Sequence, residues 1–378
     1  MPETGPKHYF QEERSVAEVK WELLGKCLGV WSSSHLALYP PDANVPLHFI
    51  DLNAAEGYHT DALNDPIPCN WLALFRNTVK TPRLQQSVRF YLGYPMKQPL
   101  ENLQAQLAET NAYELLSEPP ILLHSRENRD LLEAALAAQE AAFIYMDPFR
   151  SGYAQKMLLQ SGDTARQTEM LLHFTPDGIR KALGGKKTGK ALAAFFGERM
   201  RRIKAYCGRE KDNARRAQFM AQHLESLLLE KGLNPLFFPI YKPGTGVVSQ
   251  YLIFASPQSA RYTCFKHLIL PYTDYQQDGV PLLAANHGHD PQLALFSHRP
   301  AFSLELLASD LACGASRFKF KAVEKVYELH SPNTPYTPDN YLVAYERLRD
   351  AGRVELLNGK TMQTVRKVTY TSVVKYLS

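Results

Sequence analysis

An apolar run of strand length that ends in an acid and an aromatic residue is the clearest chemical pattern in the chain. Residues 143–149 read FIYMDPF, so Asp147, Pro148 and Phe149 follow the run directly. A carboxylate at a strand end can accept from an exocyclic amino group while a neighbouring aromatic ring stacks on a flipped base. We therefore interpret Asp147 and Phe149 as candidate catalytic residues. The sequence leaves open the alternative that Asp147 only caps the turn into the next helix.

A second pattern is a concentration of positive charge. Residues 180–216 hold thirteen lysines and arginines but three acids, a net charge of +10, whereas the whole chain carries +5. One positive patch on an otherwise acidic protein favours a polyanionic partner, so nucleic acid is the expected ligand. The predicted nucleic-acid-binding residues are Lys186, Lys187, Lys190, Arg199, Arg201, Arg202, Lys204, Arg215 and Arg216. The alternative is a solvated helical face on a protein-interaction adaptor.

Short apolar runs separated by helical segments would position the first pattern. The strand-like runs lie at residues 46–52, 88–92, 120–124, 141–147 and 169–174. They are apolar without alternation, which is typical of a parallel sheet covered by helices on both faces.

The predicted parallel strands are followed by an antiparallel hairpin. Residues 236–241 and 250–255 flank a Pro-Gly-Thr-Gly turn and predict a hairpin. A parallel sheet that ends in such a hairpin is the layout of class I methyltransferases. The predicted fold class is therefore α/β, with a Rossmann-like, class I methyltransferase-like sheet and a basic helical insertion at about residues 180–232.

The last part of the chain has a separate pattern. Three helical segments follow residue 300, and the third begins near Thr337. Residues 353–357 and 365–374 then predict a hairpin joined by an Asn-Gly-Lys turn at 358–360. Three helices and a terminal hairpin are in winged-helix order. We therefore expect a methyltransferase-like domain over residues 1–270, a connecting segment over 271–300 and a winged-helix domain over 301–378.

Four blocks in this order resemble the bacterial three-Cys-motif partner proteins. Residues 49–57 (FIDLNAAEG) are similar to that family's first-strand motif Y/F-I-D-L-F-A-G-P-G. Residues 143–149 resemble its F-I-D-P-F motif, and residues 168–174 (TEMLLHF) its T-E-V-L-I-N-F strand. Residues 250–256 (QYLIFAS) resemble its Y-Y-L-I-F-A-T strand. The resemblance implies an S-adenosylmethionine-type domain and a protein partner.

The resemblance also assigns cofactor-binding positions. Asp51 would orient the cofactor's amino group, and Asn53 and Gly57 would lie in the loop around its methionine part. Ala55 and Glu56 replace the family's Gly and Pro, and Leu92-Gly93-Tyr94-Pro95 has no acid for the ribose hydroxyls. The sequence therefore predicts an eroded S-adenosylmethionine site, leaving open an active enzyme, a non-catalytic subunit of a multi-protein assembly, or Asp51 as a simple turn cap.

Composition sets the remaining expectations. Five dispersed cysteines favour a reducing, cytoplasmic setting over a disulfide framework. No apolar stretch is long enough to span a bilayer, so no membrane association is expected. The histidines at 287, 289 and 298 lack the spacing of a metal site, and no metal is predicted.

Overall fold

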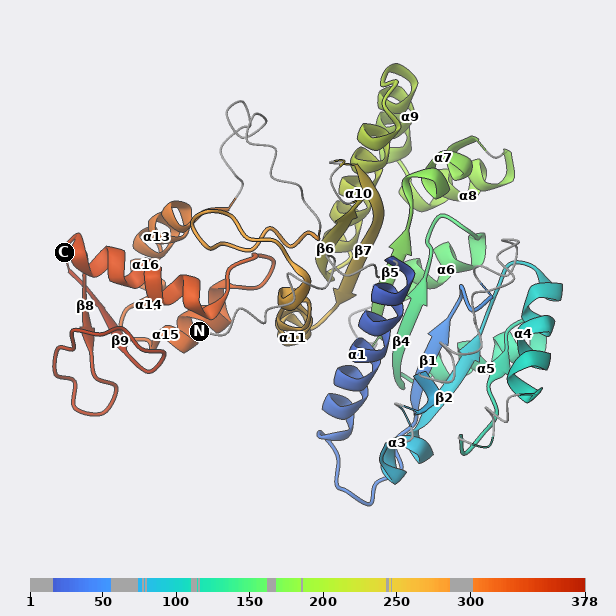
Figure 1. Cartoon of the computed structure of the whole chain (residues 1–378), viewed down its shortest axis with the longest axis horizontal. Helices are drawn as coiled ribbons and strands as arrows, with labels where there is room; N and C mark the ends of the chain where they lie inside the picture. The colour runs from blue at the N-terminus through green and yellow to red at the C-terminus, as the bar shows by residue number, and fades with distance from the viewer. Residues whose placement is uncertain are drawn as a thin grey trace. The chain divides into compact units, whose positions relative to one another are not determined.

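The computed structural model in Figure 1 describes residues 16–55, 74–76, 78, 80–109, 114, 116–161, 168–184, 186–242, 245, 247–285 and 302–377. The chain divides into two compact units. The sheet unit comprises Gln11–Pro239 and Val247–Gln258, and the C-terminal unit comprises Met1–Phe10, Ile240–Gly246 and Ser259–Ser378.

The sheet unit is built on seven strands. They are β1 (Leu47–Asp51), β2 (Val88–Leu92), β3 (Ile121–Leu122), β4 (Ala141–Met146), β5 (Thr168–Phe174), β6 (Asn234–Tyr241) and β7 (Val248–Ser256). The strand order is β3-β2-β1-β4-β5-β7-β6, and β7 runs antiparallel to β5. The other strand pairs from β3 to β5 are parallel. The predicted α/β class is confirmed as a mostly parallel sheet compatible with a Rossmann-like fold.

The sheet buries side chains on both faces, which explains the lack of alternation in its strands. On one face Phe143 lies between Phe49 and Trp31, with ring centroids 5.9 and 5.7 Å away. On the other face Ile144 and Met146 belong to a large apolar cluster shared with several helices. β1 and β4 are fully buried along their whole length, so the ends of these two strands are held in fixed register.

Helices cover the sheet and form the insertion. They are α1 (Val16–Leu36), α3 (Pro82–Ser87), α4 (Lys97–Glu109), α5 (Arg126–Ala137), α6 (Gly152–Ser161), α7 (Pro176–Gly184), α8 (Lys186–Phe196), α9 (Arg199–Arg209) and α10 (Asn213–Glu230). The predicted basic insertion corresponds to α7–α10, of which α7 and α10 pack against β7 (Figure 1). Asp212 caps α10 by accepting from Ala214 N at 2.8 Å and separates it from α9. None of the helices in the described ranges could cross a bilayer.

The C-terminal unit has its own core. Its elements are α11 (Ser259–Ile269), the 3-10 helix η3 (Leu270–Tyr272), α13 (Leu304–Cys313), α14 (Ala315–Phe318), α15 (Val323–His330), α16 (Pro338–Asp350), β8 (Val354–Leu357) and β9 (Val373–Tyr376). Leu307, Val326 and Tyr341 are fully buried at the centre of that core. α11 groups with this unit, although the sequence analysis placed residues up to 270 with the sheet.

The predicted C-terminal hairpin is wrong in its second strand. Asn358 Oδ1 accepts from Lys360 N, so the chain turns at the Asn-Gly pair as expected. Thr364 then forms only an isolated bridge with Leu357, and the true partner of β8 is β9. The Asn-Gly signal specifies a local turn, and it carries no information on the later segment that pairs with β8.

A buried lysine joins α11 to the loop after α15. Lys266 is fully buried, and Nζ donates to the backbone oxygens of Tyr336, Thr334 and Ser331 at 2.8, 3.3 and 3.4 Å. It also lies 5.1 Å from the ring centroid of Tyr327. Within the described ranges no carboxylate is close enough to pair with it. Burial lowers the pKa of Lys266 to about 7 because the charged form loses its hydration.

This burial predicts a pH dependence of stability. An unfolded lysine titrates near a pKa of about 10.4, so between about pH 7 and 10 the unfolded chain binds the extra proton. The free energy of unfolding therefore gains up to about 1.4 kcal/mol per pH unit from this group in that range, and the gain is lost as the pH falls towards 7. Lys266→Met removes the gain. The measurement is urea unfolding by circular dichroism from pH 6 to 10, with the exposed Lys367→Met as control. A difference between wild type and Lys266→Met that stays constant with pH would contradict the assignment.

Candidate functional site

Three of the predicted site residues meet where β1 and β4 end. β1 continues its pairing for one residue, since Leu52 N donates to Tyr145 O at 2.9 Å. The Asn53 side chain then joins the two strands. With its amide assigned so that both partners are satisfied, Oδ1 accepts from Asp147 N of the β4 end at 2.7 Å and Nδ2 donates to the neighbouring Leu52 O at 3.2 Å. Asp51 Oδ1 accepts from Asn53 N at 2.6 Å. The sequence analysis named Asp147 as a candidate catalytic residue and Asp51 and Asn53 as cofactor-binding positions, and the structure brings the three together at the ends of β1 and β4.

Both acids take part in local turns. Asp51 is fully buried, and its Oδ1 holds the backbone of Asn53. Asp147 is half-buried, and its Oδ1 accepts from Phe149 N at 2.8 Å. The other oxygen of Asp147, Oδ2, faces the first turn of α7, where a Cβ added at Gly178 would lie 3.7 Å from it. The turn-capping alternative that the sequence left open is therefore present in the geometry of both residues.

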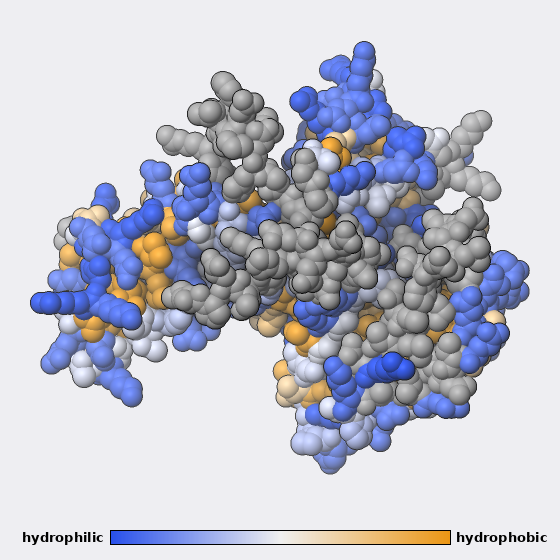
Figure 2. All heavy atoms as spheres, viewed as in Figure 1, coloured by the Kyte–Doolittle hydropathy of each residue, from blue (hydrophilic) through white to orange (hydrophobic). Residues whose placement is uncertain are grey.

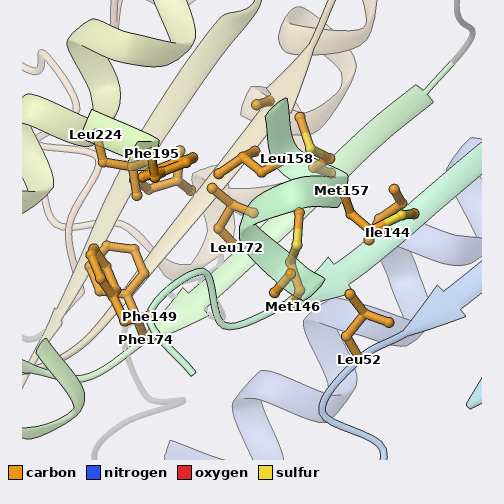
Figure 3. Close-up of a cluster of buried hydrophobic side chains, with 14 of the residues drawn as sticks. Leu52, Ile144, Met146, Phe149, Met157, Leu158, Leu172, Phe174, Phe195 and Leu224 are labelled. Carbon is orange, nitrogen blue, oxygen red and sulfur yellow. The ribbon is translucent and has the colours of Figure 1, made fainter. Parts of the chain in front are cut away.

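Phe149 lies in the hydrophobic core. Only 2% of its surface is exposed. Its ring meets Phe174 edge-on with centroids 5.0 Å apart and lies parallel to Phe196 with centroids 6.4 Å apart. Figure 3 shows it pointing into the cluster beside Phe174. A nucleobase has no exposed face of this ring to stack on unless the ring leaves the core.

The end of β2 closes tightly against the end of β1. Gly93 N donates to Asp51 O at 2.6 Å, and Ala54 N donates to Gly93 O at 3.1 Å. A Cβ at Gly93 would lie 3.0 Å from the Leu52 side chain, a tight approach that explains a glycine here. Beyond it, the guanidinium carbon of Arg150 lies 5.2 Å from the centre of the Tyr94 ring. A guanidinium group therefore lies over Tyr94, the second residue after β2.

Some predicted positions cannot be placed. Gly57 and the histidines at 287, 289 and 298 lie outside the described residues, as do the side chains of Lys186 and Lys187. Among the residues that the structure does describe, no group of three or more His, Cys, Asp or Glu side chains is arranged to hold a metal ion.

The basic segment separates into two kinds of cation. Arg199 forms an ion pair with Glu230, and Arg215 lies 3.7 Å from Glu210 and 3.8 Å from Asp212. These two predicted residues are therefore largely compensated by the protein's own carboxylates. Arg216 is held by neutral acceptors instead, with Nε donating to the backbone oxygen of Glu210 at 2.5 Å.

The remaining cations of α9 share one exposed face. Met200 and Ile203 are buried, so the opposite side of the helix points to solvent. This side carries Arg201, Arg202 and Arg209, and Lys204 lies at its edge towards α7; we call these four residues the α9 cationic face. Within the described ranges none of the four has a carboxylate at ion-pair distance. Figure 2 shows a strongly hydrophilic surface over this helix. Arg209 is the member that the sequence analysis counted as charge but did not name as a binding residue.

Small residues stand between these cations. Ala205 and Gly208 are exposed on the same side of α9 and have little side chain to hold a ligand away from the helix. Lys190, on α8, is also exposed. Arg201, Arg202 and His223 line a cavity of about 700 Å³ between α9 and α10. Burial, with help from Arg199 and Arg202, lowers the pKa of His223, so this histidine adds no charge at neutral pH.

Comparisons with known proteins do not assign the chain to a family. No protein-family model matches the chain, and no curated protein matches it in a sequence comparison. The function therefore has to be argued from the geometry of the site.

The link between β1 and β4 can be tested by mutation. Asn53→Ala removes the acceptor of Asp147 N and leaves a polar group without its hydrogen bond, which we expect to lower the free energy of unfolding by about 1–3 kcal/mol. Gln222→Ala, an exposed amide on α10, is the control and should change it little. Urea unfolding measures both. Equal midpoints for Asn53→Ala and wild type would show that the link does not hold the strand ends.

Proposed function

We propose that this chain is a nucleic-acid-binding protein built on a class I methyltransferase-like sheet, and that it acts without S-adenosylmethionine. The observation that carries the proposal is the α9 cationic face. Three arginines lie on one side of a helix with a lysine at its edge, and no acid stands among them between residues 199 and 209. A protein that neutralises phosphates in this way gains binding free energy from released counterions, whatever the base sequence.

The sheet layout supports the comparison with methyltransferases. Only β7 and its neighbour β6 follow the parallel strands in the order, and β7 is antiparallel to β5. That arrangement resembles the class I layout and supports the proposal, and the ends of β1 and β4 are where such sheets bind ligands. Fold alone does not define activity, so the residues at this edge decide the question.

The residues at this edge do not fit S-adenosylmethionine. The methyl group of Ala55, which stands where the motif has glycine, is buried in the loop after β1, where a bound cofactor needs close backbone approach. The segment after β2 has no carboxylate for the ribose hydroxyls, and Arg150 lies over Tyr94 there. These features favour the non-catalytic alternative over a methyl-transfer enzyme.

We further propose that the C-terminal unit is a winged helix that contacts a protein partner. Ala322, between α14 and α15, bridges Val373 of β9, so the helices alternate with strand pairing as in that fold. The exposed side of α16 carries Asp339, Arg347 and Asp350 and is not basic. This balance of charge suits a protein surface better than a phosphate backbone.

The cofactor part of the proposal predicts a negative binding result. Isothermal titration calorimetry with S-adenosylmethionine should give no heat of binding up to millimolar concentration. The same protein preparation should bind an oligonucleotide, which shows that it is folded and competent. Saturable binding of the cofactor would contradict the proposal and return the chain to the enzyme class.

The nucleic-acid part predicts a change in salt dependence. Replacing Arg201, Arg202 and Arg209 together by alanine removes up to three phosphate contacts. Each phosphate contact contributes about 0.7 to 0.9 to the slope of log K against log salt concentration. The magnitude of that slope should therefore decrease by about 2 to 3 in the triple variant. Fluorescence anisotropy with labelled single-stranded and double-stranded DNA and RNA measures this slope.

A matched control separates local contacts from net charge. Lys97, Arg126 and Lys156 are exposed cations on α4, α5 and α6, and their replacement by alanine removes the same three charges. We expect that variant to keep a slope close to that of wild type. Equal slopes for both triple variants would refute the α9 cationic face as the binding surface.

A further inference from the structure

A second cavity lies within the insertion, bounded by α7, α9 and α10. Its volume is about 320 Å³. That volume is near the lower limit of small-molecule sites, about 300 Å³, so it suits one compact ligand. The floor of the cavity is apolar and its rim is positively charged. A ligand that fits must therefore combine an apolar part with a negatively charged group.

The floor of this cavity is apolar. Ile179 of α7 and Ala217 of α10 are each 1% exposed, and Leu183 and Cys207 complete the surface as half-buried side chains. Burial raises the pKa of the Cys207 thiol, so this group remains neutral and adds to the apolar character. The flat ring of a nucleobase gains free energy by leaving water for such a surface.

The rim carries three cations from three different helices. They are Arg180 of α7, Lys204 of α9 and Arg216 of α10. No carboxylate lines the cavity in the part of the chain that the structure describes. Arg180 pairs with Asp177, whereas Lys204 has no carboxylate at ion-pair distance among the described residues. Arg216 is oriented by Glu210 O and by Asn213 Oδ1, 3.5 Å from its Nη1, so its positive charge is retained.

The larger cavity between α9 and α10 is less suited to an anion. Glu198 and Glu230 line it together with its arginines, and Glu230 already pairs with Arg199. The smaller cavity therefore has the more one-sided charge. Lys204 belongs to both this cavity and the α9 cationic face, so a strand lying on that face passes the mouth of the cavity.

We propose that the cavity bounded by α7, α9 and α10 binds a single nucleotide of the strand that the α9 cationic face holds. The base lies on Ile179 and Ala217, and its phosphate meets Lys204 and Arg216. This inference rests on the proposed function and adds a site for an unstacked or terminal nucleotide. The selectivity follows from size, because one nucleotide fills the space and a base pair does not enter.

Gly208 offers a way to block the cavity without disturbing the fold. It lines the cavity within α9, and a Cβ added there meets nothing within 4 Å. Gly208→Phe therefore places a ring at the mouth of the cavity. Gly184, also in the lining and also open, provides an independent blocking variant, Gly184→Phe. Gly29→Phe on α1 is the matched control, since its Cβ is equally free and it does not line the cavity.

The test is calorimetric binding of the four nucleoside 5′-monophosphates, with adenosine and inorganic phosphate as partial ligands. We expect at least one monophosphate to bind wild type and Gly29→Phe alike. Gly208→Phe and Gly184→Phe should weaken it at least about tenfold by excluding the base. Lys204→Ala should weaken it about tenfold or more through loss of a charged hydrogen bond. Adenosine and phosphate alone should each bind more weakly than the monophosphate.

Two results would overturn the inference: no monophosphate binds wild type at millimolar concentration, or both blocking variants bind as wild type does. Oligonucleotide binding then separates this failure from failure of the proposed function. If a wild-type salt slope survives in Gly184→Phe, whose substitution lies on α7 and not on α9, the α9 cationic face stands and only the nucleotide cavity is lost. If wild type binds no oligonucleotide, the proposed function itself is wrong.

Discussion

Helix α9 buries Met200 and Ile203, and this packing decides where its arginines point. Both side chains belong to the apolar cluster that also holds one face of the sheet. Residues three or four apart share one face of a helix, so burial of Met200 and Ile203 turns the arginines at the intervening positions towards solvent. The α9 cationic face is thus a consequence of the core. A protein that kept the same charges but lost this packing would have no fixed surface for phosphates.

The edge of the sheet shows how a fold can persist while its ligand site changes. The burial of β1 and β4 on both faces fixes where Asp51 and Asp147 lie. Here these residues serve the backbone: Asp51 holds Asn53, and Asn53 holds Asp147. Hydrogen-bonding groups that could face a ligand instead join the strand ends to each other. The insertion, which packs against β7 and not against the ends of β1 and β4, supplies the surface that we assign to binding.

The sheet could be predicted from sequence because doubly buried strands have a distinct pattern. The contact of Asn53 with Asp147 could not, because it depends on which strands become neighbours. The separation of the cations could not be predicted in the same way. Arg199 and Glu230 are ion-paired but distant in sequence, and a charge count treats Arg199 and Arg201 as equal. Phe149 shows the same limit, because a strand-end aromatic looks identical in sequence whether it faces a ligand or the core.

The central claim is that the solvent-facing arginines of α9, and not its ion-paired ones, meet nucleic acid. Modification by phenylglyoxal with and without a bound oligonucleotide, read by mass spectrometry, tests it at each residue. The account predicts that Arg201, Arg202 and Arg209 are protected in the complex, while Arg126 on α5 reacts equally in both states. Equal reactivity of the three α9 arginines with and without the oligonucleotide would contradict it.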